Sequence, residues 1–89
     1  LGTPAYMPWE QHLNPSLVDR RTDLFALGVT YYRLVTGKLP FPADSSEAME
    51  KLKERGVYTP VRNSDQTLPK CLERIIGKMI ARTPEDRYS

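Results

Sequence analysis

Apolar residues dominate one long segment in the first half of the chain. Residues 22–36 place apolar side chains on almost every face of a helix, and Arg33 is the only charge after Asp23. Thr22 can cap the start of such a helix, and Gly37 can end it. A helix that is apolar all round belongs in the interior of a larger structure. We therefore predict a buried central helix over 22–36, which 89 residues can hardly surround.

Two more helices are predicted on its C-terminal side. Residues 45–55 are rich in charge and should form a surface helix, with a capping-box-like start at Asp44 and Glu47 and a stop at Gly56. The last helix, over 68–82, is amphipathic, because its apolar residues recur at helical spacing. That stripe consists of Leu68, Leu72, Ile75, Ile76, Met79 and Ile80.

Prolines divide the rest of the chain. Residues 1–15 contain three of them and predict an extended or turning segment, with a short helix beginning near Pro8. Residues 38–42 and 57–67 are expected to be irregular loops. The predicted fold class is therefore mainly α, and the length allows one small domain at most.

Composition narrows the class of protein. Hydrophobic residues make up 39% and charged residues 27%, and the net charge is +2, which is typical of a globular domain. The short basic runs are flanked by acids, so we expect solvated helix faces and no binding to nucleic acid. No run of about 18 apolar residues occurs, so no membrane segment is expected. The lone Cys71 fits a reducing compartment, and we expect a cytoplasmic location.

Four short motifs occur in order along the chain. They are Gly-Thr-Pro-Ala-Tyr-Met-Pro-Trp-Glu-Gln (2–11), Asp-Leu-Phe-Ala-Leu-Gly (23–28), Gly-Lys-Leu-Pro-Phe (37–41) and Thr-Pro-Glu-Asp-Arg-Tyr-Ser (83–89). This series resembles serine/threonine protein kinase domains, from the end of the activation segment (G-T-x-x-Y-M-A-P-E) through the F helix to the P-x-x-R-x-S/T near the end of the lobe. The resemblance covers essentially the whole chain and implies a partial kinase C-terminal lobe.

The resemblance implies substrate-binding roles for the first motif. Thr3 would be the threonine of the substrate loop, whose hydroxyl reaches the catalytic aspartate and lysine of a serine/threonine kinase. Gly2, Pro4 and Tyr6 would shape the pocket for the substrate residue that follows the phosphoacceptor. Without the surrounding motif, Thr3 would be interpreted as an ordinary turn threonine.

Three charged residues are implied to support the site. Glu10 and Arg87 would form a buried ion pair that ties the activation segment to the base of the lobe, since a planar guanidinium can hold a carboxylate at two points. From sequence alone, two solvated surface charges are the simpler interpretation. Asp23 would accept N–H groups of the catalytic loop; alternatively, it is a first-turn acid that complements the helix dipole.

Other candidate residues carry weaker signals. The family has Ala-Pro-Glu where this chain has Pro8, Trp9 and Glu10, so a large indole needs room and a partner for its N–H. His12 lacks the context of a catalytic-loop histidine and is expected at the surface. Cys71 is remote in sequence from His and acid clusters, so neither a thiol nucleophile nor a zinc ligand is expected.

The motifs that perform phosphoryl transfer do not occur in these 89 residues: the glycine-rich loop, the phosphate-binding lysine, H-R-D and D-F-G. The resemblance therefore implies a parent kinase that uses ATP and Mg²⁺, with this segment inactive alone and binding neither. Its partners would be protein substrates and the remainder of the kinase domain. Two alternatives stay open: a pseudokinase scaffold, and a free-standing helical interaction module that folds as an isolated monomer.

Overall fold

The computed structural model describes residues 4–14, 16 and 19–88, and these residues form helices and loops without any strand. The α-helices are α1 (Trp9–Leu13), α2 (Arg20–Thr36), α3 (Ser46–Arg55) and α4 (Lys70–Met79). Short 3-10 turns lie at Pro4–Tyr6, Val61–Asn63 and Pro84–Asp86. The described part of the chain is mainly α, as predicted.

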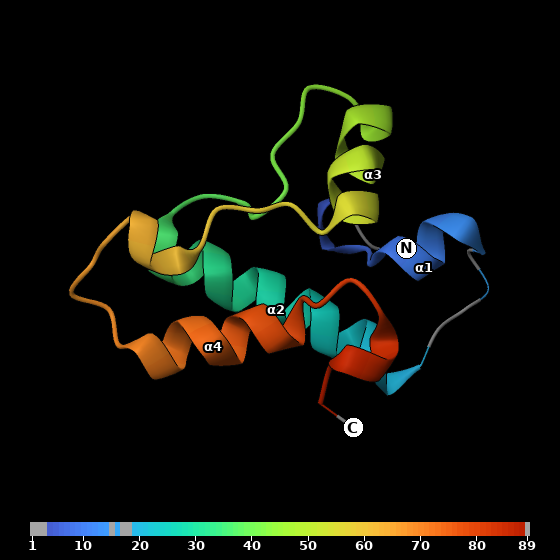
Figure 1. Cartoon of the computed structure of the whole chain (residues 1–89). Helices are drawn as coiled ribbons and strands as arrows, with labels where there is room; N and C mark the ends of the chain where they lie inside the picture. Colours follow the sequence, from blue (N-terminus) through green and yellow to red (C-terminus); the bar gives the residue numbers. More distant parts are fainter. Residues whose placement is uncertain (1–3, 15, 17–18, 89) are drawn as a thin grey trace.

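Helices α2 and α4 lie side by side and form the body of the molecule, while α3 stands on the side of α1 (Figure 1). The face of α2 that carries Phe25, Val29 and Tyr32 is buried, each side chain being at most 2% exposed. This spacing of four and three residues is that of one helical stripe. The core that packs on this stripe consists of Phe41, Val61, Ile76 and Ile80, with partly buried neighbours.

A second apolar stripe of α2 is not covered. Leu27, Tyr31 and Leu34 are 44%, 43% and 74% exposed. They follow the same helical spacing as the buried stripe but lie on another face. The described residues supply a core on one face of α2 only, and burial of its other faces stays a prediction for a larger structure.

Helix α2 begins earlier than the sequence pattern indicated. Asp19, not Thr22, is the N-cap: its carboxylate accepts hydrogen bonds from the backbone N–H groups of Arg21 (2.8 Å) and Thr22 (3.3 Å). The Thr22 hydroxyl in turn accepts from the backbone N–H of Asp19 at 3.3 Å, which completes a capping box. At the other end Gly37 has φ 73°, a left-handed conformation that glycine adopts without steric cost.

The two later helices are also shorter than predicted. Helix α3 is capped by Ser45, whose hydroxyl accepts from the N–H of Ala48 at 3.2 Å, so Asp44 lies outside it. Helix α4 spans Lys70–Met79 and not 68–82. It follows Pro69. Beyond its end, the carbonyl groups of Ala81 and Arg82 accept hydrogen bonds from the side chain of Arg87. None of the described helices is long and apolar enough to span a bilayer.

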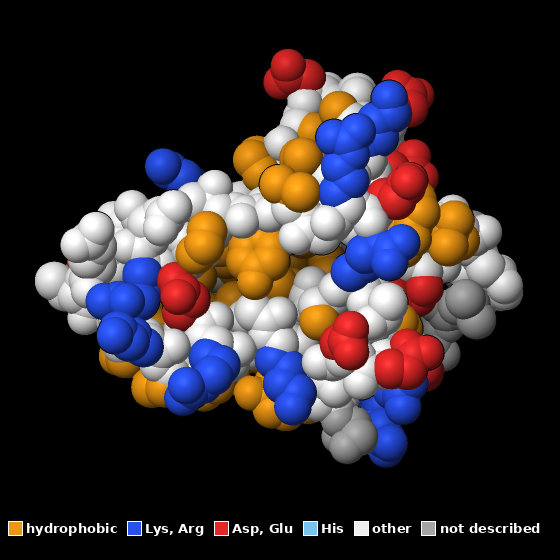
Figure 2. Space-filling view, in the orientation of Figure 1, with side chains coloured by type: hydrophobic (Ala, Val, Ile, Leu, Met, Phe, Trp, Pro, Cys, Tyr) orange, Lys and Arg blue, Asp and Glu red, His pale blue; other side chains and the backbone are white. Residues whose placement is uncertain are grey.

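The surface reflects this arrangement. Figure 2 shows hydrophobic side chains between α3 and the α2–α4 pair, and Lys and Arg side chains along α4. The loop after α3 is attached to the core by aromatic contacts: Tyr58 meets Tyr32 and Phe41 edge-on, with ring centroids 6.3 and 5.8 Å apart. The Tyr32 hydroxyl also donates a hydrogen bond to the carbonyl of Thr59. This loop contains the Val61–Asn63 turn, where only irregular structure was predicted.

Candidate functional site

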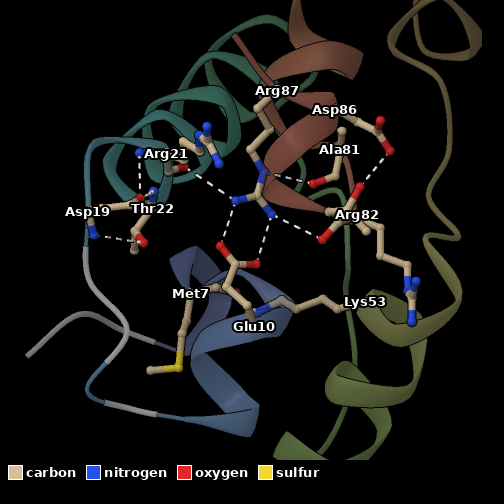
Figure 3. Close-up of polar contacts among 11 residues, drawn as sticks. Met7, Glu10, Asp19, Arg21, Thr22, Lys53, Ala81, Arg82, Asp86 and Arg87 are labelled. Atoms are coloured by element: carbon tan, nitrogen blue, oxygen red, sulfur yellow. Dashed lines mark hydrogen bonds and ion pairs between the residues drawn. The ribbon is translucent and has the colours of Figure 1, made fainter. Parts of the chain in front are cut away.

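The centre of the candidate site is a two-point ion pair between Glu10 and Arg87. The Nη1 atom of Arg87 lies 2.6 Å from Glu10 Oε2, and Nη2 lies 3.0 Å from Oε1 (Figure 3). The Arg87 side chain is fully buried, and the Glu10 side chain is 16% exposed. Glu10 comes from the first turn of α1, and Arg87 follows the 3-10 turn Pro84–Asp86. The fold therefore joins two residues that are 77 positions apart in sequence.

Backbone carbonyl groups bind the remaining donors of Arg87. Its Nε donates to Ala81 at 2.8 Å, Nη2 donates to Arg82 at 3.2 Å, and Nη1 donates to Arg21 at 3.4 Å (Figure 3). The guanidinium thus has as many acceptors as it has N–H groups. A buried charge is stable in a protein when its hydrogen bonds are satisfied in this way. Arg87 connects α1, the start of α2 and the end of α4.

A second buried cation contacts α1 and the residue before it. Lys53 of α3 is 1% exposed, and its Nζ donates to the carbonyl oxygen of Met7 at 2.5 Å. The same Nζ lies 3.2 Å from Nε2 of His12 in α1. Nδ1 of His12 lies 3.4 Å from Oε1 of Glu50, one helical turn before Lys53. The charge-rich helix that was predicted to lie on the surface therefore buries one of its charges.

Burial changes the acidity of these groups. It lowers the pKa of Lys53 from 10.5 to about 8, because the ammonium is removed from water, and the charge of Glu50 opposes this shift only in part. Burial, followed by the neighbouring Lys53 charge, also lowers the pKa of His12, against an opposing effect of Glu50. His12 is therefore neutral at pH 7. The contacts assign its proton to Nδ1, facing Glu50, which leaves Nε2 to accept from Lys53.

The expected surface position of His12 was wrong, because its side chain is only 9% exposed. The indole that departs from the family pattern lies beside it: the rings of Trp9 and His12 have centroids 6.4 Å apart and are tilted. Sequence reasoning also missed Lys53. One signal was present, since Lys53 follows Met49 by four residues, and Met49 packs against the core, so both share a helix face.

The substrate-side residues are only partly described. Gly2 and Thr3 lie outside the described residues. Pro4–Tyr6 forms a 3-10 turn directly before α1. Tyr6 packs against the core, and its hydroxyl lies 3.2 Å from Nη1 of Arg33, which donates to it. This turn is thereby fixed to α2.

Asp23 is exposed in the first turn of α2. Among the described residues, none donates a hydrogen bond to its carboxylate. The structure therefore does not bring Asp23 together with Glu10 and Arg87.

Metal ligation has no candidate in the described part of the chain. No group of three or more His, Cys, Asp or Glu side chains there is arranged to hold a metal ion. Cys71 is exposed on α4. The polar contacts of the site are thus ion pairs and hydrogen bonds that hold segments together.

A helical base with a buried arginine that ties the first motif to the last is the arrangement of a kinase C-terminal lobe. A comparison with protein families agrees, since the protein kinase domain matches residues 1–89. The chain belongs to the protein kinase family.

The relatives include serine/threonine-protein kinases and a tyrosine-protein kinase. The chain is 39% identical over its full length to the serine/threonine-protein kinase Pkn1 of Myxococcus xanthus, of which it covers 13%. It is 40% identical over 97% of its length to the serine/threonine-protein kinase pkn3 of the same organism, covering 16% of it. The tyrosine-protein kinase MasK of M. xanthus is 40% identical over 98% of the chain, which covers 13% of that relative. The chain thus spans a small fraction of the curated relatives it matches.

Proposed function

We propose that this chain supplies the substrate-facing loop and the structural base of a kinase domain that transfers the γ-phosphate of ATP to serine or threonine of proteins. The observation that carries this proposal is the Glu10–Arg87 pair, which holds the first kinase-like motif on the last one. A carboxylate held at two points by a buried guanidinium fixes position as well as distance. The base therefore determines where the segment before Glu10 lies.

In this proposal, the residues before α1 bind the substrate. Thr3 contacts the catalytic aspartate and lysine of the remaining domain, while Gly2, Pro4 and Tyr6 shape the pocket for the residue after the phosphoacceptor. The contacts of Tyr6 with Arg33 and with the core support this role, because they attach the turn to α2. A preorganised loop binds a peptide with less loss of conformational entropy than a mobile one.

The exposed face of α2 is proposed to support the catalytic loop. The exposed carboxylate of Asp23 is an acceptor available to backbone N–H groups from the rest of the domain. Leu27, Tyr31 and Leu34 on α2 form an uncovered apolar stripe, which is costly to leave in water. Covering it with the remainder of the kinase domain removes that cost.

The proposal places the binding of ATP and Mg²⁺ outside this chain. The phosphate-binding and metal-binding motifs of kinases are missing from the sequence, and the described residues offer no metal-ligand group. We therefore assign ATP and Mg²⁺ binding to the remainder of the domain and expect the segment alone to be inactive. The free thiol of Cys71 supports a location in the reducing cytoplasm.

Replacement of Thr3 tests the substrate-loop assignment. In the intact kinase, Thr3→Ala should reduce kcat/KM for a serine peptide by roughly tenfold or more, because one hydrogen bond to a charged group is lost near the reacting atoms. Thr3→Ser, which keeps the hydroxyl, should retain most of the turnover. Steady-state phosphorylation assays with melting curves for each variant provide the measurement. Unchanged turnover in Thr3→Ala would remove Thr3 from the site.

A further inference from the structure

The buried Lys53 has a specific acceptor that the local helix leaves unused. Met7 precedes Pro8, the N-cap of α1, and the carbonyl of Pro8 accepts the hydrogen bond from Gln11 N–H at 3.2 Å. The carbonyl of Met7 comes one residue before the first carbonyl that takes part in the hydrogen bonds of α1. Lys53 donates to it at 2.5 Å from across the fold, 46 residues away in sequence. The lysine thus binds the backbone at the junction between the Pro4–Tyr6 turn and α1.

A second contact fixes the other end of α1. The Nε2 atom of His12 lies 3.2 Å from the same Nζ, and its Nδ1 faces Glu50 on α3. The chain Glu50–His12–Lys53 therefore begins and ends on α3 and encloses one residue of α1. We call Lys53, His12, Glu50 and the Met7 carbonyl the α3 latch. Trp9 lies against the His12 ring, at the position where this chain departs from the family pattern.

Simple packing does not require a lysine at this position. The Nζ atom of Lys53 lies 6.0 Å from the centroid of the Phe25 ring. An apolar side chain of similar length would fill this space without the cost of burying an ammonium group. A buried cation with directional hydrogen bonds instead selects one register between two elements, which is the best attested use of buried polar groups. The elements in this case are α3 and Met7–His12.

We propose that Lys53 is a positioning residue for the substrate loop, holding Met7 and α1 on α3 so that the Pro4–Tyr6 turn keeps its place. Arg87 holds α1 through Glu10 (Figure 3), and Lys53 holds the residue before α1 through the Met7 carbonyl. Both cations act on the few residues that follow the turn. The inference rests on the proposed function, because the Pro4–Tyr6 turn would bind a peptide substrate only if the protein is a kinase.

Lys53→Met in the intact kinase tests this role. The KM for a peptide substrate should rise about tenfold, as expected for one lost charge-assisted hydrogen bond, while the KM for ATP stays unchanged. Lys51→Met is the matched control, since Lys51 is exposed on the same helix. A merely structural role for Lys53 would lower melting temperature and active fraction but leave the peptide KM unchanged. His12→Ala should raise the KM for the peptide by a smaller factor. If Lys53→Met does not fold, His12→Ala takes its place in the test.

Amide hydrogen exchange provides a readout independent of catalysis. Exchange at the amides of α1 should be roughly tenfold faster in Lys53→Met than in wild type or Lys51→Met, because α1 opens more readily. If the wild-type protein phosphorylates no peptide, the proposed function fails, and this exchange ratio alone decides whether the latch positions α1. An unchanged peptide KM in an active enzyme, or unchanged exchange in α1, would overturn the role of Lys53.

Discussion

Replacing Glu10 by alanine in the intact kinase should lower the free energy of unfolding by roughly 3–5 kcal/mol. The reason is that Arg87 would remain fully buried with its charge while losing the carboxylate partner that it has among the described residues. The carbonyl groups of Ala81, Arg82 and Arg21 would still accept hydrogen bonds, but they carry no net charge. Arg87→Ala should cost a similar amount, because Glu10 then loses both donors and the ends of α4 and α1 lose their connection. Urea unfolding at neutral pH measures both losses.

The double variant shows whether the two residues act as a pair. Glu10→Ala with Arg87→Ala removes both charges together, so its loss should be much smaller than the sum of the single losses. Glu85→Ala is a suitable control, since Glu85 is an exposed acid two residues from Arg87, and its replacement should change stability by about 0.5 kcal/mol or less. Strictly additive losses would show that the pair contributes no coupling energy.

Gly28→Ala should destabilise the domain although alanine is the better helix former. A Cβ at Gly28 would lie 2.7 Å from Cγ2 of Ile80 and 2.7 Å from Cβ of Met79. The Met79 Cβ is attached directly to the backbone, so only a shift of α4 away from α2 can make room. Overpacking of this kind costs about 1–3 kcal/mol, more than the gain of up to about 1 kcal/mol in helix propensity. Urea unfolding of the intact domain should show a net loss.

Gly77→Ala on α4 is the matched control for that substitution. Its added Cβ would meet only the hydroxyl oxygen of Tyr58, at 2.8 Å, which is the far end of a side chain. A small change in the χ1 torsion of Tyr58 moves this oxygen away, so the loss should be much smaller than at Gly28. Equal losses at both positions would contradict the view that close approach of α2 and α4 requires glycine at position 28.

Local sequence rules predicted the helices but not all of their boundaries. Both Asp19 and Thr22 can cap a helix, and the structure uses them together, with Asp19 as the cap and Thr22 in the first turn. The pattern could not distinguish these roles because either side chain can accept a backbone hydrogen bond at the start of a helix. At α3 the hydroxyl of Ser45 displaces the predicted acidic cap for a similar reason.

Contacts between distant segments were harder to predict. Glu10 and Arg87 were paired only through resemblance to a family, since nothing in their local sequence separates a buried charge from a solvated one. Lys53 and His12 matched no motif, and a charge-rich helix normally predicts exposure. Their burial depends on α1 packing against α3, which is decided by the whole fold. Periodicity is informative about which face of a helix is apolar, but not about which charges another segment covers.

The exposed stripe of α2 connects the fold to the proposed function. Its residues were predicted to be buried, and they are apolar enough to be so, but the described residues cover only the opposite face. A helix of this kind fits the centre of a larger kinase domain. The relatives that the chain matches are several times its length, in agreement with that interpretation.

The most direct test is a phosphotransfer assay with the intact protein that contains this chain. It would receive ATP, Mg²⁺ and an equimolar mixture of peptides that differ only in carrying serine, threonine or tyrosine, and the 89-residue chain alone would be assayed in parallel. We predict phosphate on serine or threonine with the intact protein and none with the isolated chain. Phosphate on tyrosine only, no transfer by the intact protein, or transfer by the isolated chain would contradict the assignment.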